Sequence, residues 1–238
     1  MGKHKNTHGH EPTRTNDEGL IPKHGGYRNL KTFQLAKLIY DITVRFCEKY
    51  IDPRSRTYDQ MIQAARSGKQ NIAEGSMDSA TSKKIELKLT GTAKGSLEEL
   101  RQDYEDYLRH RRFPQWEPNH PVLMRFKALQ CKTLMEFRRW VADEVKREQK
   151  GNKGKMHTDN TDPHGQTRAN RKRALRAGVR ESLCPSVYVA NGPLSLINLC
   201  VYLLGNQLKA QANAFELEGG FTERLYRKRI QARRSTKD

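Results

Sequence analysis

The stretch Gln60-Met-Ile-Gln-Ala-Ala-Arg-Ser-Gly-Lys-Gln-Asn-Ile-Ala-Glu-Gly75 decides the fold that we predict for this chain. Its apolar residues recur on one side at helical spacing, at Met61, Ile62, Ala65 and Ile72. Four of its residues have little or no side chain and allow a neighbouring helix to approach closely: Ala64, Ala65, Ser67 and Gly68. Gly75 is expected to end the helix, because glycine adopts the left-handed cap conformation at little cost. The stretch therefore predicts the second, tightly packed helix of a bundle.

Apolar residues at intervals of three and four predict four further helices around this one. Their expected ranges are about 30–50, 79–110, 122–145 and 191–218. Asp52-Pro53 should stop the first of these, and Pro193 suits the first turn of the last. A short final helix over 221–234, capped by Thr222, also fits the pattern. Gly91 and Gly95, in the third helix, are expected to face close neighbours on the second.

These segments predict an all-α protein, an antiparallel up-and-down helical bundle of four core helices plus an extra helix. Segments without a face to bury are predicted to be disordered. The expected organisation is a disordered tail over 1–26, a helical bundle over 27–148, a disordered basic linker over 149–186, a suffix helix completing the bundle over 187–220 and a basic tail over 221–238.

The charge of the chain indicates a partner rich in phosphate. The 45 Lys and Arg residues outnumber the 27 Asp and Glu residues, which gives a formal net charge of +18 at pH 7. Much of this charge lies outside the predicted helices of the bundle: residues 150–180 contain nine basic and two acidic residues, and residues 221–238 contain seven and two. Charge in this arrangement is typical of phosphate binding, although solvated tails that keep a protein soluble are the alternative.

Composition also argues against several classes of site. The four cysteines, Cys47, Cys131, Cys184 and Cys200, form no Cys-x-x-Cys pair, so buried reduced thiols are expected instead of zinc ligands or disulfides. His4, His8 and His10 fit no familiar zinc spacing, and a solvated tail is the simpler interpretation. We therefore expect no metal and no cofactor.

No secretion signal begins the sequence, and its longest apolar run, Leu194 to Leu204, covers 11 positions where about 20 are needed to cross a bilayer. A cytoplasmic protein without a membrane partner is expected. Glu98 and Glu99 are adjacent, so they diverge on a helix, and His110 and His120 have no catalytic partner at a telling distance. We therefore expect no enzymatic activity.

Two motifs carry a resemblance to a known family. The run Gln-Asn-Ile-Ala-Glu-Gly at 70–75 and the run Ala93-x-Gly-Ser-Leu-Glu-Glu-Leu100 are similar to those of four-helix-bundle proteins encoded in intervening sequences of large-subunit (23S) ribosomal RNA genes. Leu30 to Ala36 is similar as well, and residues 191–229 resemble the C-terminal suffix of one branch. The chain departs from the family at Ile62-Gln63, where two arginines are usual, and at Gly68-Lys69, where Ile-Pro is usual.

The resemblance implies a four-helix bundle and nucleic-acid binding. The family includes the accessory variability protein of diversity-generating retroelements, a basic pentameric ring that binds nucleic acid and a reverse transcriptase. The resemblance thus implies a homo-oligomer, a pentameric ring being one form, and a reverse transcriptase or another protein as a further partner.

The leading functional hypothesis is a non-enzymatic bundle that binds RNA or DNA through phosphate contacts. The candidate residues are Arg168, Arg171, Lys172 and Arg173 in the linker, Arg227, Lys228, Arg229, Arg233 and Arg234 in the tail, and Arg66 and Lys69 on the second helix. The alternative is an oligomeric structural or adaptor protein that binds a protein partner without touching nucleic acid. The long apolar faces of the third and last bundle helices are its candidate interfaces.

Overall fold

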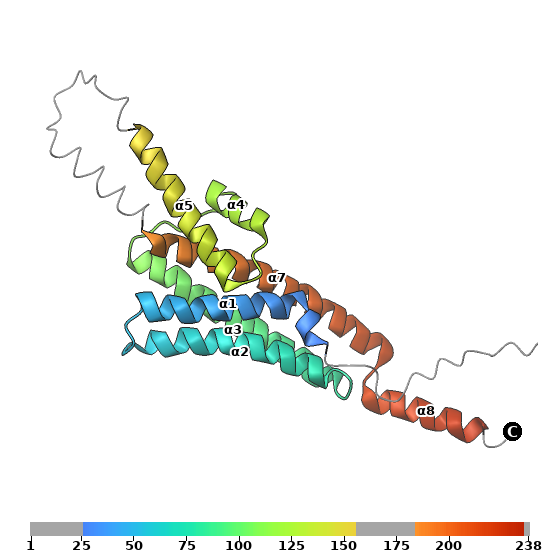
Figure 1. The fold of residues 1–238 in the computed structure, drawn as a ribbon. Coiled ribbons are helices and arrows are strands. Elements are labelled where there is room, and N and C mark those ends of the chain that lie inside the picture. The colour runs from blue at the N-terminus through green and yellow to red at the C-terminus, as the bar shows by residue number, and fades with distance from the viewer. Residues whose placement is uncertain (1–25, 156–183, 236–238) are drawn as a thin grey trace, which may run out of the picture.

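The computed structural model describes residues 26–155 and 184–235, and within these ranges the chain is helical with short connections and contains no strand. The predicted all-α class is therefore confirmed. Four long helices lie side by side (Figure 1): α1 (Lys31–Tyr50), α2 (Arg56–Asp78), α3 (Lys83–His110) and α7 (Pro185–Glu218). A 3-10 turn, η1 (Tyr27–Asn29), precedes α1. Each helix of the four packs against the next, and α7 closes the ring against α1.

Cross-helix contacts establish that neighbouring helices are antiparallel. Thr32, at the start of α1, donates a hydrogen bond of 3.2 Å to Gln207, near the end of α7. Gln211, also near the end of α7, donates one of 3.0 Å to Glu86, at the start of α3. The hydroxyl groups of Ser67 on α2 and Ser96 on α3 lie 3.0 Å apart. These pairings alternate the chain direction around the bundle.

The stretch 60–75 forms a close contact between α2 and α3. A Cβ atom at Gly68 would lie 2.8 Å from Cγ and Cδ2 of the fully buried Leu97, so α3 packs directly against the α2 backbone there. Gly75 does not end the helix as predicted; it is buried inside α2, where a Cβ would lie 3.3 Å from Cβ of Leu89. The leucines of α3 thus fill the space that the missing side chains of α2 leave.

Gly91 and Gly95 do not take part in this contact. A Cβ atom added at either position would meet nothing within 4 Å, so the prediction that they face close neighbours is wrong. Both lie on the side of α3 away from α2. The close approach depends on small residues of one helix alone, because the partner helix supplies leucines.

The centre of the bundle is aromatic and almost fully closed to solvent. Phe46 of α1 lies 4.8 Å from Tyr104 and 4.7 Å from Tyr107 of α3, measured between ring centroids. Thr43 donates to the carbonyl of Ile39 at 2.8 Å, which leaves its oxygen to accept the Tyr104 hydroxyl at 3.1 Å. Cys47 is buried in the same layer, and burial raises the pKa of its thiol to about 12. The expectation of buried thiols thus holds here.

The segment predicted as one helix over 122–145 forms two helices outside the four-helix ring. Helix α4 (Pro121–Leu129) ends at Gln130, whose φ of 47° is left-handed, and α5 (Leu134–Lys155) begins after the turn. The fourth place in the ring belongs to α7, and α5 leans across α7 and away from α1 (Figure 1). The apolar pattern of this segment was correctly helical, but its partners are α7 and the end of α1.

Helix α7 begins earlier than predicted, at Pro185, so Pro193 lies inside it. Asn191 is 1% exposed, and its amide group is hydrogen-bonded at both ends. Its oxygen accepts from the backbone N–H of Trp116 at 2.8 Å, and its nitrogen donates to the carbonyls of Pro114 and Val187. Gly192 lets α5 pack closely on α7, because a Cβ atom there would lie 2.6 Å from the Phe137 ring. Asn191-Gly192-Pro193 is therefore a docking point in mid-helix and not a helix start.

The predicted disordered linker and tail are partly helical. Helix α5 continues to Lys155 and α7 starts at Pro185, so 149–155 and 185–186 of the expected linker are ordered, whereas 156–183 lie outside the described residues. The tail forms α8 (Phe221–Ser235), which begins one residue before Thr222; the Glu223 carboxylate, not Thr222, accepts the Gly220 N–H at 2.9 Å. The N-terminal residues 1–25, with His4, His8 and His10, also lie outside the described residues.

Helix α7 and the residues after it contain one stretch that is long and apolar enough to cross a membrane, judged by length and composition alone. However, 61% of that window is buried inside the protein. A core helix of a bundle passes the same test, because it is surrounded by apolar neighbours.

The carboxyl group of Asp103 on α3 makes stability depend on pH. Partial burial, followed by the charges of Asp106 and Glu99, raises its pKa from 3.8 to about 6. The folded state therefore holds this proton more tightly than the unfolded chain, so stability should rise as the pH falls from about 6 to about 4.

Asp103→Asn removes this cost of ionisation. We expect the variant to be more stable than the wild type at neutral pH by on the order of 1 kcal/mol, a reduced figure because the group is half exposed and screened. Below pH ~4 both side chains are neutral and the two proteins should unfold alike. Urea unfolding at the two pH values measures this difference, and a variant no more stable at neutral pH contradicts it.

Candidate functional site

Helix α8 carries the densest basic charge in the described part of the chain. Between Phe221 and Ser235 there are six basic residues and one acidic residue. The helix leaves the bundle at Gly219, whose φ is 73°, and Figure 1 shows it extending beyond the end of α7. Its cations are thus displayed on a helix that has solvent on most sides.

Two arginines of α8 hold the helix in place. Arg224 donates to the carbonyl of Ala80, in the turn between α2 and α3, at 3.3 Å. Arg227 donates to the carbonyl of Glu218 at the C-terminal end of α7, where positive charge suits the helix dipole. Arg227, which we predicted as a nucleic-acid contact, is thereby a positioning residue of the helix as well.

The other predicted residues of α8 are exposed: Lys228, Arg229, Arg233 and Arg234. Arg229 and Arg233 are four residues apart and so lie on one side of the helix. No acidic residue of the described ranges forms an ion pair with Arg229, Arg233 or Arg234 within 4.0 Å. These three guanidinium groups can therefore bind an anion without first breaking such a pair.

The candidates on α2 do not join this surface. Arg66 is exposed, whereas Lys69 is partly buried with its Nζ atom 4.1 Å from the centre of the Tyr40 ring, a cation–π contact within the bundle. The linker candidates Arg168, Arg171, Lys172 and Arg173 lie outside the described residues. Of the predicted contacts, the structure brings together only those of α8.

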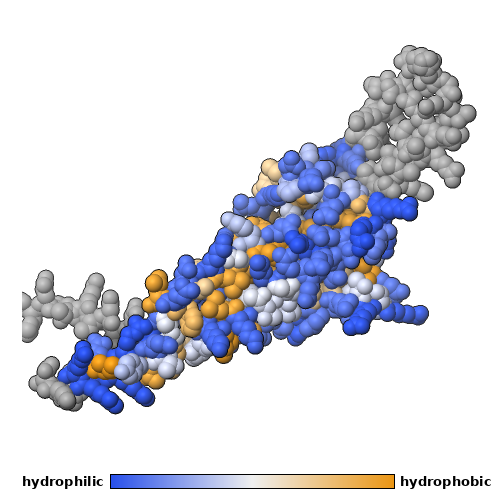
Figure 2. All heavy atoms as spheres, turned by 180° about the vertical axis from the view of Figure 1, so that it is seen from behind, coloured by the Kyte–Doolittle hydropathy of each residue, from blue (hydrophilic) through white to orange (hydrophobic). Residues whose placement is uncertain are grey.

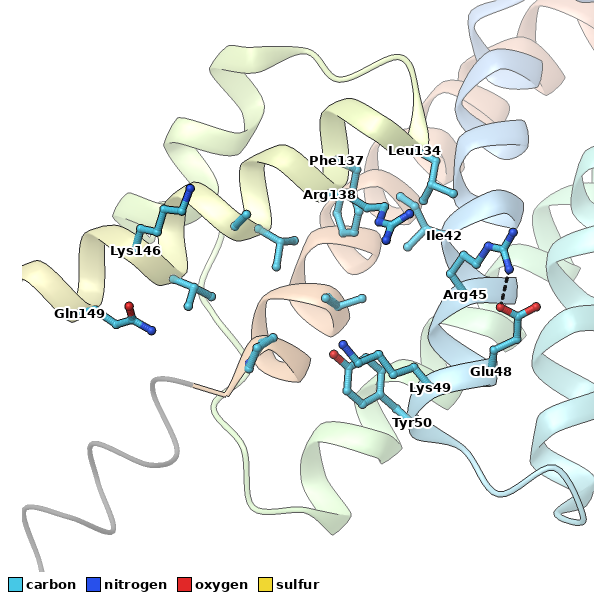
Figure 3. A pocket seen from close by; sticks show the side chains of 15 residues that line it. Ile42, Arg45, Glu48, Lys49, Tyr50, Leu134, Phe137, Arg138, Lys146 and Gln149 are labelled. Atoms are coloured by element: carbon cyan, nitrogen blue, oxygen red, sulfur yellow. Dashed lines mark hydrogen bonds and ion pairs between the residues drawn. The ribbon is translucent and has the colours of Figure 1, made fainter.

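A groove lies at the end of the molecule away from α8, between α1, α5 and the start of α7 (Figure 3). Its volume is about 970 Å³. Apolar side chains form most of its lining: Ile42, Leu134, Phe137, Val141, Ala142, Val145, Pro185 and Val189. Four cations also line it, Arg45 and Lys49 from α1 and Arg138 and Lys146 from α5, against a single carboxylate, Glu48. That carboxylate is already paired with Arg45 at 2.7 Å.

The groove exists because α5 is anchored on the face that it turns toward α4 and α7. Phe137 and Trp140 pack on Gly192, and the buried Glu144 binds Arg125 of α4 through two hydrogen bonds of 2.8 and 2.5 Å. Tyr188 of α7 donates a short hydrogen bond to Glu148. These contacts hold α5 against α4 and α7 while its adjoining face stays open toward α1.

Sequence reasoning missed this groove. The sequence predicts the core face of a bundle helix for this segment, with Leu134, Phe137, Val141 and Val145 on it. Apolar residues have the same spacing on a core face and on the lining of an open groove. The available sign was the pair Arg138 and Lys146, which follow the apolar residues on the same face of α5. A row of basic residues along the edge of an apolar stripe is more typical of an open surface than of a core.

Glu98 and His120, for which no catalytic role is expected, make contacts that stabilise the fold. Glu98 pairs with Arg101, which also pairs with Glu105. His120 stacks on Trp116 at 4.7 Å between ring centroids, and burial, followed by the charge of Arg125, lowers its pKa. Within residues 26–155 and 184–235, no three His, Cys, Asp or Glu side chains gather as metal ligands would.

A second cavity, of about 650 Å³, lies between α4, α7 and the start of α1. Its lining is mainly apolar, with Lys31 and Lys127 among the residues around it, and Lys127 is bound to the carbonyl of Pro118 at 2.7 Å. It therefore offers less unpaired charge than the first groove.

Comparisons with protein-family models, with curated proteins and with solved structures found no match to this chain. The resemblance to the proteins of ribosomal RNA intervening sequences stays a prediction, and the function has to be argued from the surfaces described above.

Proposed function

We propose that this protein is a non-enzymatic helical bundle that binds RNA or DNA through phosphate contacts, with α8 as its principal described contact. The observation that carries the proposal is the exposure of Arg229, Arg233 and Arg234 on a helix with net positive charge. Guanidinium groups bind phosphate oxygens through paired hydrogen bonds, and each contact releases counterions from the nucleic acid. The basic residues of 156–183 would add to this binding.

The attachment of α8 at its first half favours binding over a purely solubilising role. Arg224 and Arg227 tie its first half to the bundle at two carbonyl groups, so its remaining cations are presented in a fixed arrangement. A fixed array loses less conformational entropy on binding than the same residues in a coil. Binding is expected to be tolerant of sequence, because phosphate contacts do not read bases.

The test measures the salt dependence of binding to an RNA duplex and to single-stranded RNA. We expect Arg229→Gln/Arg233→Gln/Arg234→Gln to reduce the slope of log K against log salt by about 2 to 3, and to weaken binding about 10- to 100-fold at low salt. The matched control is Arg54→Gln/Arg56→Gln/Arg112→Gln, which removes three exposed charges at the opposite end of the bundle. The control should bind nearly as the wild type does.

Three results would contradict the proposal or its assignment to α8. Absence of binding at low salt, or binding that does not change with salt, rules out phosphate contacts. Equal weakening of RNA binding in the two triple variants means that the overall positive charge of the protein, and not the arginines of α8, is responsible for binding. A loss confined to Arg171→Gln/Lys172→Gln/Arg173→Gln moves the contact from α8 to the linker.

A second candidate function, an oligomeric adaptor, is favoured by apolar residues left exposed on α7. Leu199 is 44% exposed and Leu217 is 86% exposed, and Figure 2 shows an apolar band along the middle of the rear face. The apolar face of α3 does not supply such an interface, because its buried members pack inside the bundle. Sedimentation equilibrium decides this candidate: a species of 27.5 kDa is a monomer and argues against a ring.

A further inference from the structure

The groove between α1, α5 and α7 combines an apolar floor with a cationic rim. Its rim holds Arg45, Lys49, Arg138 and Lys146, and the one carboxylate among its described lining residues, Glu48, is paired with Arg45 (Figure 3). An apolar surface alone would favour any apolar occupant. The four cations around it favour an occupant that also carries negative charge. The groove therefore favours a negatively charged occupant over a positively charged one.

The shape of the groove matches a helix. On α5 the lining residues are Leu134, Phe137, Arg138, Val141, Ala142, Val145, Lys146 and Gln149, which recur at intervals of three and four. This stripe covers four turns, about 22 Å at 1.5 Å per residue. An amphipathic helix of similar length can lay its own apolar stripe along it, as helices bound in grooves do.

The chain's own linker is a poor occupant of the groove. Residues 156–183 join the end of α5 to the start of α7, but they contain six basic and three acidic residues. Their net positive charge would add to that of the rim and not neutralise it. A nucleic acid would satisfy the rim but leave Val141 and Val145 without an apolar partner.

We propose that the groove is a docking site for an acidic amphipathic helix of a partner protein. The apolar side of that helix packs on Leu134, Val141, Val145 and Val189, which are partly exposed in the groove. Its acidic residues, on both edges of the apolar side, pair with Lys49 on α1 and with Arg138 and Lys146 on α5, none of which forms an ion pair within the described residues. This site is separate from α8, so the protein can hold a protein partner and a nucleic acid together.

The experiment uses the full chain and a fluorescent synthetic helix of about 16 residues, with leucine at every third and fourth position and glutamate on both edges of the leucine stripe. Fluorescence anisotropy measures its affinity. We expect Arg138→Glu/Lys146→Glu to weaken binding at least about tenfold, because each reversal turns an attraction into a repulsion. The matched control, Lys84→Glu/Lys88→Glu, makes the same change at two exposed lysines of α3 that do not line the groove, and should alter the affinity less than about threefold.

A charge swap separates a specific effect from misfolding. The same peptide with lysine in place of glutamate should bind Arg138→Glu/Lys146→Glu better than it binds the wild type, since the signs are restored. The Val145→Asp variant should weaken both peptides, and circular dichroism verifies that each variant remains folded.

Four outcomes would overturn the proposal: no binding of the acidic peptide, equal loss in the control variant, failure of the charge swap, or displacement of the peptide by RNA. The last would mark the groove as part of the nucleic-acid surface. The Arg229→Gln/Arg233→Gln/Arg234→Gln variant should leave peptide binding unchanged, so this test and that of nucleic-acid binding fail independently.

Discussion

Replacing Gly68 with alanine is expected to destabilise the protein, although alanine is the better helix former. The new methyl group would lie 2.8 Å from two carbon atoms of Leu97, a side chain with no exposed surface, so Leu97 would have to shift within the core. Overpacking of this kind costs roughly 1 to 3 kcal/mol and can exceed that at a tight helix crossing. After the gain in helix propensity of about 1 kcal/mol, we expect a net loss of about 1 to 2 kcal/mol in the free energy of unfolding.

Gly95→Ala is the matched control for this prediction. It adds the same methyl group to α3, the partner helix, at a site where nothing lies within 4 Å. It should stabilise the protein by about 0.5 to 1 kcal/mol, because only the helix-propensity gain remains. Denaturant unfolding of both variants gives the comparison. Equal changes of the same sign would show that α2 and α3 are not in the close contact described.

Replacing Glu144 with alanine is expected to release α4 from α5. The Glu144 side chain is 5% exposed and binds Arg125 of α4 through both oxygens and Arg147 of α5 at 3.1 Å. Removing one partner of a buried ion pair costs about 3 to 5 kcal/mol. The two arginines are partly exposed and can regain water, so we expect a smaller cost, about 2 to 3 kcal/mol.

Asp143→Ala serves as its control, since Asp143 is the neighbouring exposed carboxylate on α5 and forms no ion pair within the described ranges. It should change the stability by less than about 0.5 kcal/mol. Thermal unfolding measures both variants, and hydrogen exchange of α4 and α5 locates the effect. A Glu144 variant as stable as its control would mean that apolar packing alone holds α4 to α5.

The Glu144 variant also bears on the groove. If α5 loosens on α4 and α7, the stripe that contains Val141 and Val145 is no longer held at a fixed distance from α1. The acidic peptide should then bind more weakly, although no residue of the groove has changed.

The sequence by itself determined the helices and their class. Periodic apolar residues and the small residues around Gly68 are local features, and a helix needs little more than local information. The boundaries that failed did so for a tertiary reason. Gly75 stays helical because α3 packs on it, and Pro193 is tolerated inside α7 because Asn191 and Gly192 hold the surrounding segments there.

Only the tertiary structure decided which helices form the ring and which surfaces stay open. An apolar stripe has the same spacing in a core and in a groove, so the segment 122–145 could be recognised as helical but its place could not. That place follows from contacts far apart in the chain: the Phe137 ring on Gly192, and the Tyr188 hydroxyl on Glu148. Such contacts are a property of side-chain shape and burial in three dimensions, and no spacing along the sequence encodes them.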